Sequence, residues 1–196
     1  MVALIKSIWA GIAISIGSMI YVNIGGPVGA FFFSIGLLLV FVLGLNLYTG
    51  LIGFISNLNG LLFCAIVFIG NFIGAGASLL MTPEPAAALA AAKLAMPWYI
   101  AIAKGALCGA LIYAAVVSYK NNKWWITLFA VPAFILAGYE HSIADMCYFI
   151  GARMITWESL GFIGLVALGN AVGAILLHQS LLFVKKYDII KEKGEK

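Results

Sequence analysis

Apolar residues in this chain form six long runs, and the length of these runs constrains the fold more than any other feature. The runs cover residues 4–22, 28–55, 60–81, 98–119, 124–150 and 160–184. A helix needs roughly 20 apolar residues to cross the hydrocarbon of a bilayer, and it satisfies its own backbone hydrogen bonds there. Only 9% of the residues are charged, against about 25% in an ordinary soluble domain. The sequence therefore predicts an all-α membrane protein with six transmembrane helices.

The connectors between the runs are short, so residues 1–196 are expected to form one transmembrane domain that ends in a charged tail at residues 185–196. Basic residues in short loops favour the cytoplasmic side. The basic residues that fall inside when the N-terminus is cytoplasmic are Lys6, Lys120, Lys123, Lys185, Lys186, Lys191, Lys193 and Lys196, and those that fall outside are Lys93, Lys104 and Arg153. We therefore expect a multi-pass protein of the cell (inner or plasma) membrane with both termini cytoplasmic.

The third and sixth runs share a short motif. GNFIGA at residues 70–75 returns as GNAVGA at residues 169–174. Three spans separate equivalent positions, so the two copies must have opposite orientations in the bilayer, which is the inverted-repeat plan of many transporters and channels. The expected repeats are residues 1–92 and 93–184. The motif also suits close helix packing through small residues, with Asn71 and Asn170 supplying interhelical hydrogen bonds.

Polar groups interrupt the second and fifth runs at corresponding places. GLNLYTG at residues 44–50 interrupts the second run, and GYEHSIAD at residues 138–145 interrupts the fifth, after Pro132. Glycines flank both motifs, which favours two helices broken near the middle of the membrane. Freed backbone donors and the positive ends of the helix dipoles would then face a cavity that suits an anion.

These motifs, taken together and in their order, resemble those of the formate/nitrite transporter family. GYEHSIADM at residues 138–146 resembles the family's G-F-E-H-S-x-A-N-M signature, LNLYT at residues 45–49 its broken second helix, and GNAVG at residues 169–173 its last-helix G-N-x-x-G. The resemblance implies a homopentamer of aquaporin-like protomers, each with a pore for small monovalent anions such as formate, nitrite or hydrosulfide. The implied partners are the anion or its conjugate acid, protons and the lipid bilayer. It implies no enzyme activity, cofactor, metal or nucleic acid.

The resemblance also implies roles for individual residues. His141 matches the central pore histidine, Thr49 the hydroxyl that faces it, and Lys93 the lysine of the outer vestibule. Glu140 is expected to turn away from the pore and to bind backbone donors at the break. The residues expected to form apolar constrictions are Phe33, Ile112 and Phe134 on the outer side, and Leu37, Leu47 and Tyr48 on the inner side.

Three positions depart from the family pattern. Asp145 stands where the family usually has asparagine, Gly109 replaces an asparagine of the fourth helix, and Asn46 occupies a position that is often acidic. The charge near the expected pore is therefore rearranged.

Elementary electrostatics predicts what such a pore would pass. A charged side chain at the bilayer centre costs ~3 kcal/mol on insertion scales, so an apolar constriction favours the neutral acid over its anion. Lys93 is expected to gather the anion, whose affinity for a proton rises as the dielectric falls. His141 would then relay that proton or hydrogen-bond the passing species, with Thr49 positioning it.

Two other classes of function remain open at this point. A membrane-embedded metalloenzyme would need several ligands, yet Glu140, His141 and Asp145 do not form an H-E-x-x-H motif. A water, glycerol or ammonium channel could share the fold. The paired Asn-Pro-Ala boxes of water channels are absent from this sequence, and Lys93 disfavours a route for cations.

Overall fold

Helices make up every regular element of residues 1–194, the part of the chain that the computed structural model describes. Nine of them are α-helices and three are short 3-10 helices, in this part of the chain. The all-α prediction is confirmed for these residues. The last two residues of the expected tail, 195–196, lie outside the described residues.

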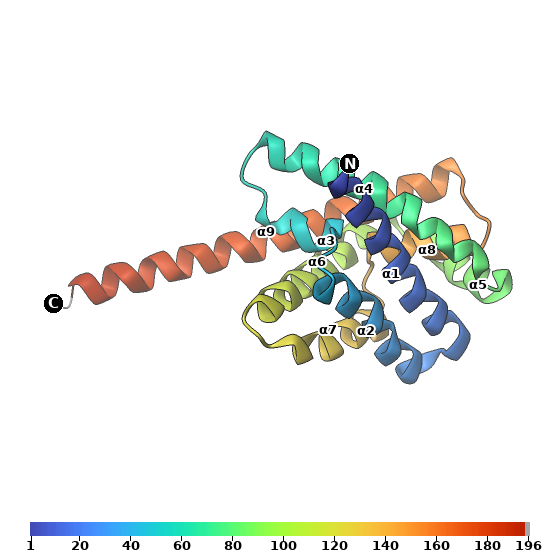
Figure 1. Ribbon diagram of the computed structural model, residues 1–196, viewed down its shortest axis with the longest axis horizontal. Helices are drawn as coiled ribbons and strands as arrows, with labels where there is room; N and C mark the ends of the chain where they lie inside the picture. The colour runs from blue at the N-terminus through green and yellow to red at the C-terminus, as the bar shows by residue number, and fades with distance from the viewer. Residues whose placement is uncertain (195–196) are drawn as a thin grey trace.

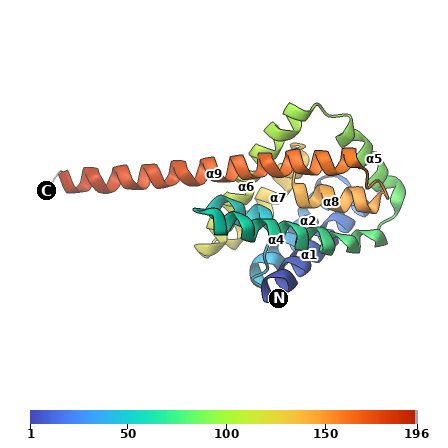
Figure 2. The ribbon, with the colours of Figure 1, turned by 90° about the horizontal axis from the view of Figure 1, so that it is seen from above.

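Within residues 1–194, four helices contain a stretch long and apolar enough to cross a membrane. They are α1 (Val2–Ile24), α4 (Leu58–Ala75) with its 3-10 extension η2 (Gly76–Leu80), α6 (Trp98–Lys120) and α9 (Trp157–Gly194). They coincide with four of the six apolar runs. The longest is α9, with 38 residues, and its C-terminal part projects from the rest of the molecule (Figure 1, Figure 2).

The other two runs are interrupted at the polar motifs. In the second run, α2 (Gly26–Val42) is followed by an irregular segment and then by α3 (Tyr48–Leu51) and the 3-10 helix η1 (Ile52–Phe54). In the fifth run, η3 (Trp124–Ile126) and α7 (Thr127–Leu136) are followed by an irregular segment and α8 (Ser142–Gly151). Gly44 and Gly138 have φ of 59° and 66° at these interruptions. Glycine adopts this left-handed conformation at little cost, so each helix can end there.

Glycines bring two helix pairs into backbone contact. A Cβ on Gly74 of α4 would lie 2.0 Å from the Ile8 carbonyl oxygen of α1, and a Cβ on Gly173 of α9 would lie 1.8 Å from the Ala106 carbonyl oxygen of α6. Only glycine permits such an approach. The repeated motif thus makes the same kind of contact in both halves of the chain, α1 on α4 and α6 on α9.

The connector at residues 82–97, between the third and fourth apolar runs, contains a helix that the pattern of apolar runs did not predict. This is α5 (Pro83–Leu94), which begins with proline at its first position and carries Glu84 in its first turn and Lys93 in its last. Alanine-rich sequence favours a helix, proline suits its first turn, and both charges complement the helix dipole. The helix α5 packs on α8, and Lys93 in its last turn contacts Asp145 there.

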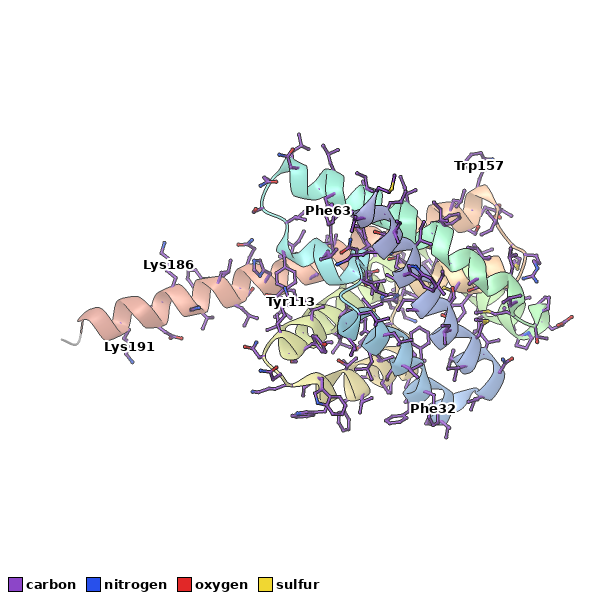
Figure 3. All side chains as sticks on the ribbon, in the orientation of Figure 1. Phe32, Phe63, Tyr113, Trp157, Lys186 and Lys191 are labelled. Atoms are coloured by element: carbon purple, nitrogen blue, oxygen red, sulfur yellow. The ribbon has the colours of Figure 1, made fainter. Side chains whose placement is uncertain are left out.

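Large apolar side chains cover the outside of the bundle. Phe32 and Phe63, labelled in Figure 3, are 49% and 38% exposed. Such exposure of phenylalanine suits a surface that faces lipid or another subunit rather than water. Lys186 and Lys191 instead lie on the projecting part of α9 (Figure 3).

Candidate substrate pathway

The two interruptions meet at a buried pair of polar side chains. The Thr49 Oγ1 atom of α3 lies 2.9 Å from the His141 Nε2 atom, and the two residues are only 1% and 2% exposed. They come from positions 92 residues apart in the chain. The structure therefore brings together two of the three residues that were expected to line the pathway.

The hydrogen bonds of His141 define its tautomer. The backbone N–H of Ala144 donates to His141 Nδ1 at 3.1 Å, so the imidazole caps the N-terminus of α8. A nitrogen that accepts a hydrogen bond carries no proton, so a neutral ring with this contact has its proton on Nε2. The Nε2–H group then donates to the Thr49 hydroxyl oxygen.

Two asparagines hold the interrupted segments with matching sets of hydrogen bonds. Asn71 Nδ2 donates to the carbonyl oxygens of Ser7 and Asn46, at 2.8 and 2.9 Å, and its Oδ1 accepts from Tyr48 N at 2.9 Å. The side chain thus spans residue 47, between Asn46 and Tyr48, and ties the first break to α1.

Asn170 repeats this arrangement at the second break. Its Nδ2 donates to the carbonyl oxygens of Gly105 and Glu140, at 2.8 and 2.9 Å, and its Oδ1 accepts from Ser142 N at 3.0 Å. The residue between the two contacts is His141. Each asparagine is fully buried and satisfies backbone groups that a broken helix leaves without partners.

Aromatic rings cover one side of the histidine. The Phe134 ring stacks on the His141 ring with 5.6 Å between centroids, and the Phe33 ring meets Phe134 edge to face at 6.0 Å. Ile112, Leu37 and Leu47 are each 1% exposed. These five apolar residues are all buried near the level of the breaks.

Tyr48 points in a different direction from the other residues expected at a constriction. Its ring packs on Phe68 of α4, and its hydroxyl donates to the Ala167 carbonyl oxygen of α9 at 3.1 Å. In this conformation the side chain joins α3 to two neighbouring helices.

Two cavities lie at opposite ends of the bundle, with the breaks between them. The first, of about 230 Å³, is lined by residues that include Tyr21 near the end of α1, Phe134 and His141. The second, of about 200 Å³, is lined by residues that include Val40 near the end of α2 and Lys120 at the end of α6. We call them the outer and the inner cavity, after the expected orientation. The apolar layer around His141 separates them.

Three charged side chains line the outer cavity next to His141. Lys93 of α5 pairs with the Glu140 Oε2 atom, and its Nζ lies 2.8 Å from Asp145 Oδ1 of α8. The Lys93 side chain is 12% exposed, that of Glu140 is 5% exposed and that of Asp145 is 1% exposed. Lys93 is thus shared by two carboxylates.

The expectation that the Glu140 carboxylate turns away from the pathway and binds backbone donors is wrong. The carboxylate pairs with Lys93 and lines the outer cavity, whereas the backbone groups at the break are satisfied by Asn170. The physical reason is that α5 delivers an ammonium group, a stronger partner for a buried carboxylate than a backbone N–H.

Two further residues occupy other places. Gly109 packs directly on Asn170, since a Cβ there would lie 2.1 Å from the Asn170 carbonyl oxygen, so the fourth-helix position has no room for asparagine. His178 is hydrogen-bonded through Nδ1 to the Tyr113 hydroxyl at 2.7 Å, away from both cavities. Within residues 1–194, the described histidine, cysteine and carboxylate side chains form no group that could hold a metal ion.

The ion pair of Lys93 with Asp145 and the place of Lys120 on the inner cavity were not anticipated. The 51 residues between Lys93 and Asp145 carry no local pattern that signals their contact. A weak indication of the place of Lys120 is present in the sequence, because this lysine directly follows an apolar run whose end must lie near a membrane surface.

The fold and this site define a class: a multi-pass α-helical membrane protein in which two interrupted helices place a buried histidine and threonine between two cavities. A model of the family "Formate/nitrite transporter" matches residues 1–184. The chain belongs to this family, and the resemblance seen in the sequence is confirmed.

Curated relatives support the same assignment. The formate channel FocA of Haemophilus influenzae is 27% identical over 168 residues, which are 68% of this chain and 59% of the relative. The nitrite transporter NirC of Escherichia coli is 31% identical over 145 residues, 60% of this chain and 53% of the relative. The matched part thus spans little more than half the length of these relatives.

Solved structures share the fold. A structure described as an FNT family ion channel matches with a TM-score of 0.84 at 24% identity, covering 93% of this chain and 89% of that one. A pentameric formate channel with formate bound matches with a TM-score of 0.74 at 21% identity, covering 96% of both chains. At these identities the likeness concerns the fold alone.

Proposed function

We propose that this protein is a membrane channel or transporter for small monovalent weak acids, such as formate, nitrite or hydrosulfide, that pass His141 as neutral acids or together with a proton. The observation that carries the proposal is the hydrogen-bonded pair of His141 and Thr49, buried in an apolar layer between two cavities. Membership of the formate/nitrite transporter family and the names of the matched relatives support it.

Desolvation favours passage as the neutral acid. Phe33, Phe134 and Ile112 form the proposed outer constriction, with Leu37 and Leu47 as the inner one. Tyr48 would join the inner constriction only in a conformation that releases its contacts with Phe68 and Ala167. A bare charge in such surroundings costs several kcal/mol, whereas a neutral acid needs only partners for its hydroxyl and carbonyl groups. The pathway would therefore carry the acid form.

His141 and Thr49 would supply those partners. With Nδ1 occupied by Ala144, the ring offers Nε2–H to an acceptor, and the Thr49 hydroxyl keeps its own hydrogen for another. A passing acid can accept from one group while it exchanges hydrogen bonds with the other. Lys93 would lie at the outer approach to this pair.

We further propose that the two interrupted runs each span the membrane once, which gives six spans and two inverted repeats at residues 1–92 and 93–184. The matching contacts of Asn71 and Asn170 and of the two glycine motifs support this plan. Three spans between equivalent positions require opposite orientations. The lysine distribution supports cytoplasmic termini in the inner or plasma membrane.

A homopentamer with one pathway in each protomer is the proposed assembly. The likeness to a pentameric formate channel and the exposed apolar residues on the outside of the bundle support it.

Flux measurements on the purified protein in proteoliposomes test the function. Wild-type protein should carry labelled formate, nitrite or hydrosulfide faster than protein-free vesicles, and His141→Ala should lose most of that flux. The variant His178→Ala, which removes the other histidine, should keep the flux if it folds. Equal flux in wild type and His141→Ala would remove the histidine from the proposal, and no flux of any of the three acids in wild type would refute the function.

A further inference from the structure

We infer that Asp145 determines the specificity of the outer cavity: it gives Lys93 a second carboxylate, keeps the cavity lining from becoming positive, and so makes this entrance select the uncharged acid over its anion. The inference rests on the proposed function and deepens it.

The geometry shows three elements converging on one ammonium group. Lys93 comes from the last turn of α5, Glu140 from the break, and Asp145 from the first turn of α8. Asp145 Oδ1 forms an ion pair with Lys93 Nζ at 2.8 Å, and neither oxygen of Asp145 accepts a hydrogen bond of good geometry from a described residue. Asp145 is 1% exposed and lines the cavity. Its second oxygen is thus a buried acceptor without a partner, next to the space that a substrate would enter.

The charges of the lining follow from these contacts. With both carboxylates ionised the three side chains sum to −1, and with a proton on one of them they sum to zero. Two carboxylates that share a buried site commonly retain such a proton. In neither state does the lining offer a net positive charge to an anion.

An asparagine at residue 145 would change this balance. Lys93 and Glu140 alone sum to zero, or to +1 when Glu140 is protonated. Each state of an asparagine-containing cavity is one unit more positive than the matching state of this one. Electrostatic attraction in such a cavity raises the rate at which an anion enters by roughly 10-fold to 1,000-fold. With Asp145 in the lining, the cavity does not attract anions in this way.

Other polar groups near the cluster do not alter the comparison. Those on the lining are the Tyr21 hydroxyl of α1, Tyr139 and His141 of the break, and Tyr148 of α8, whose ring lies 5.3 Å from Lys93 Nζ. The Lys104 ammonium of α6 lies close to Gly138 but outside the lining. Whatever charge Lys104 contributes, Asp145 and asparagine still differ by one unit.

An uncharged acid meets complementary groups in the same cavity. Its O–H can donate to Asp145 Oδ2, the acceptor without a partner, and its carbonyl oxygen can accept from Lys93 or from His141 Nε2–H. Formic acid, nitrous acid and hydrogen sulfide all have such a donor. Formate and nitrite lack this donor, and all three anions, hydrosulfide included, would meet the carboxylate as a like charge.

Uptake into proteoliposomes by four forms of the full-length protein tests the inference: wild type, Asp145→Asn, Asp145→Glu and Glu84→Gln. The last removes an exposed carboxylate from α5 outside the cavity and controls for surface charge. The probes are labelled formate between about pH 5 and pH 8, and nitrate, which stays ionised over that range because its acid is strong.

In wild type, formate uptake should fall close to tenfold per pH unit, as the formic acid fraction does, and nitrate should neither enter nor inhibit formate uptake from outside. Asp145→Asn should flatten the pH dependence and raise nitrate entry by at least about tenfold. Asp145→Glu keeps the charge, so at whatever flux it retains it should keep the steep pH dependence and the exclusion of nitrate. Glu84→Gln should behave like wild type.

Two results would overturn the inference while leaving the proposed function standing. One is equal pH profiles and equal nitrate entry in wild type and Asp145→Asn, and the other is nitrate inhibition of formate uptake by the wild type. The second result needs no variant, so it tests the inference even if Asp145→Asn does not fold. A pH-independent formate flux in the wild type would refute both the inference and the passage of neutral acid in the proposed function. Absence of formate, nitrite and hydrosulfide uptake by wild type would instead refute the proposed function.

Discussion

At the scale of single residues, His141 is fixed at both ring nitrogens. It caps α8 through Nδ1 and meets Thr49 through Nε2. Because the acceptor role of Nδ1 is tied to the start of a helix, protonation of that nitrogen would break the cap and leave the Ala144 N–H without a partner. The ring is therefore suited to offer a constant donor at Nε2, whatever molecule replaces the threonine hydroxyl.

The threonine hydroxyl gives a prediction at this scale. Thr49→Val keeps the branched shape but removes the polar atom, so His141 Nε2–H loses its partner, at a cost of about 1 kcal/mol or more. We expect formate flux in proteoliposomes to fall by about tenfold, because the proposed pathway uses this hydroxyl as a hydrogen-bond partner of the passing acid.

Thr49→Ser serves as the control because it restores the oxygen. It should recover most of the wild-type flux. If Thr49→Val and Thr49→Ser have the same flux, the hydroxyl plays no part in transport.

The asparagines give a second prediction. Asn170→Ala leaves Ser142 N and the carbonyl oxygens of Gly105 and Glu140 unpaired in the interior, and Asn71→Ala does the same at the other break. Each should lower the free energy of unfolding by on the order of 3 kcal/mol, measured by denaturation in detergent. Asn121→Ala removes an exposed amide that bonds only to Val117 O, and it should be nearly neutral. A stable Asn170→Ala protein would contradict the supporting role.

At the scale of helices and connectors, packing is set by backbone contact at small residues and by the interruptions. The pairs α1 with α4 and α6 with α9 approach so closely that carbonyl oxygens occupy the space of a side chain. These helix pairs position Asn71 and Asn170, and the two asparagines bind backbone groups at the two interruptions. The short α5 then closes one end and contributes the only lysine among the residues lining the outer cavity.

Helix packing gives a third prediction. Gly173→Val would drive side-chain atoms into the Ala106 carbonyl oxygen, which lies 1.8 Å from the position of an added Cβ. Overpacking of this kind costs ~3 kcal/mol or more, so folded protein should be lost on size-exclusion chromatography. Gly164→Val, on the same helix but with nothing within 4 Å of an added Cβ, should fold normally. If both variants fold equally well, α6 and α9 are not in backbone contact.

At the scale of the whole molecule, the apolar exterior, the four long helices and the family assignment describe an integral membrane protein. Lys186 and Lys191 lie on the projecting part of α9 (Figure 3), and Lys185 directly precedes Lys186 in the chain. With the proposed orientation, these lysines would lie at the anionic cytoplasmic leaflet, which attracts basic segments by about 1 kcal/mol per residue near the surface.

The assembly gives a fourth prediction. Native mass spectrometry of the detergent-solubilised protein should give five copies of the 20.9 kDa chain, because the exposed apolar residues need a subunit or lipid partner. A reporter that is active only in the cytoplasm should work when fused to the C-terminus. A monomer that retains full flux after reconstitution would refute the pentamer, and an inactive C-terminal reporter would refute the orientation.

The sequence by itself determined the all-α class, the positions of the four long apolar helices and the two interruptions. These features are local: apolar runs, glycines and polar motifs specify them within a few tens of residues. The motif at residues 138–145 likewise marked His141, because an ionisable group within an apolar run is expensive without a function. Only the tertiary structure decided the direction of Glu140, the helix at α5 and the pairing of Lys93 with Asp145. Those contacts join residues about 50 positions apart, and the strength of a buried ion pair depends on distance and burial, which arise from packing of the whole chain.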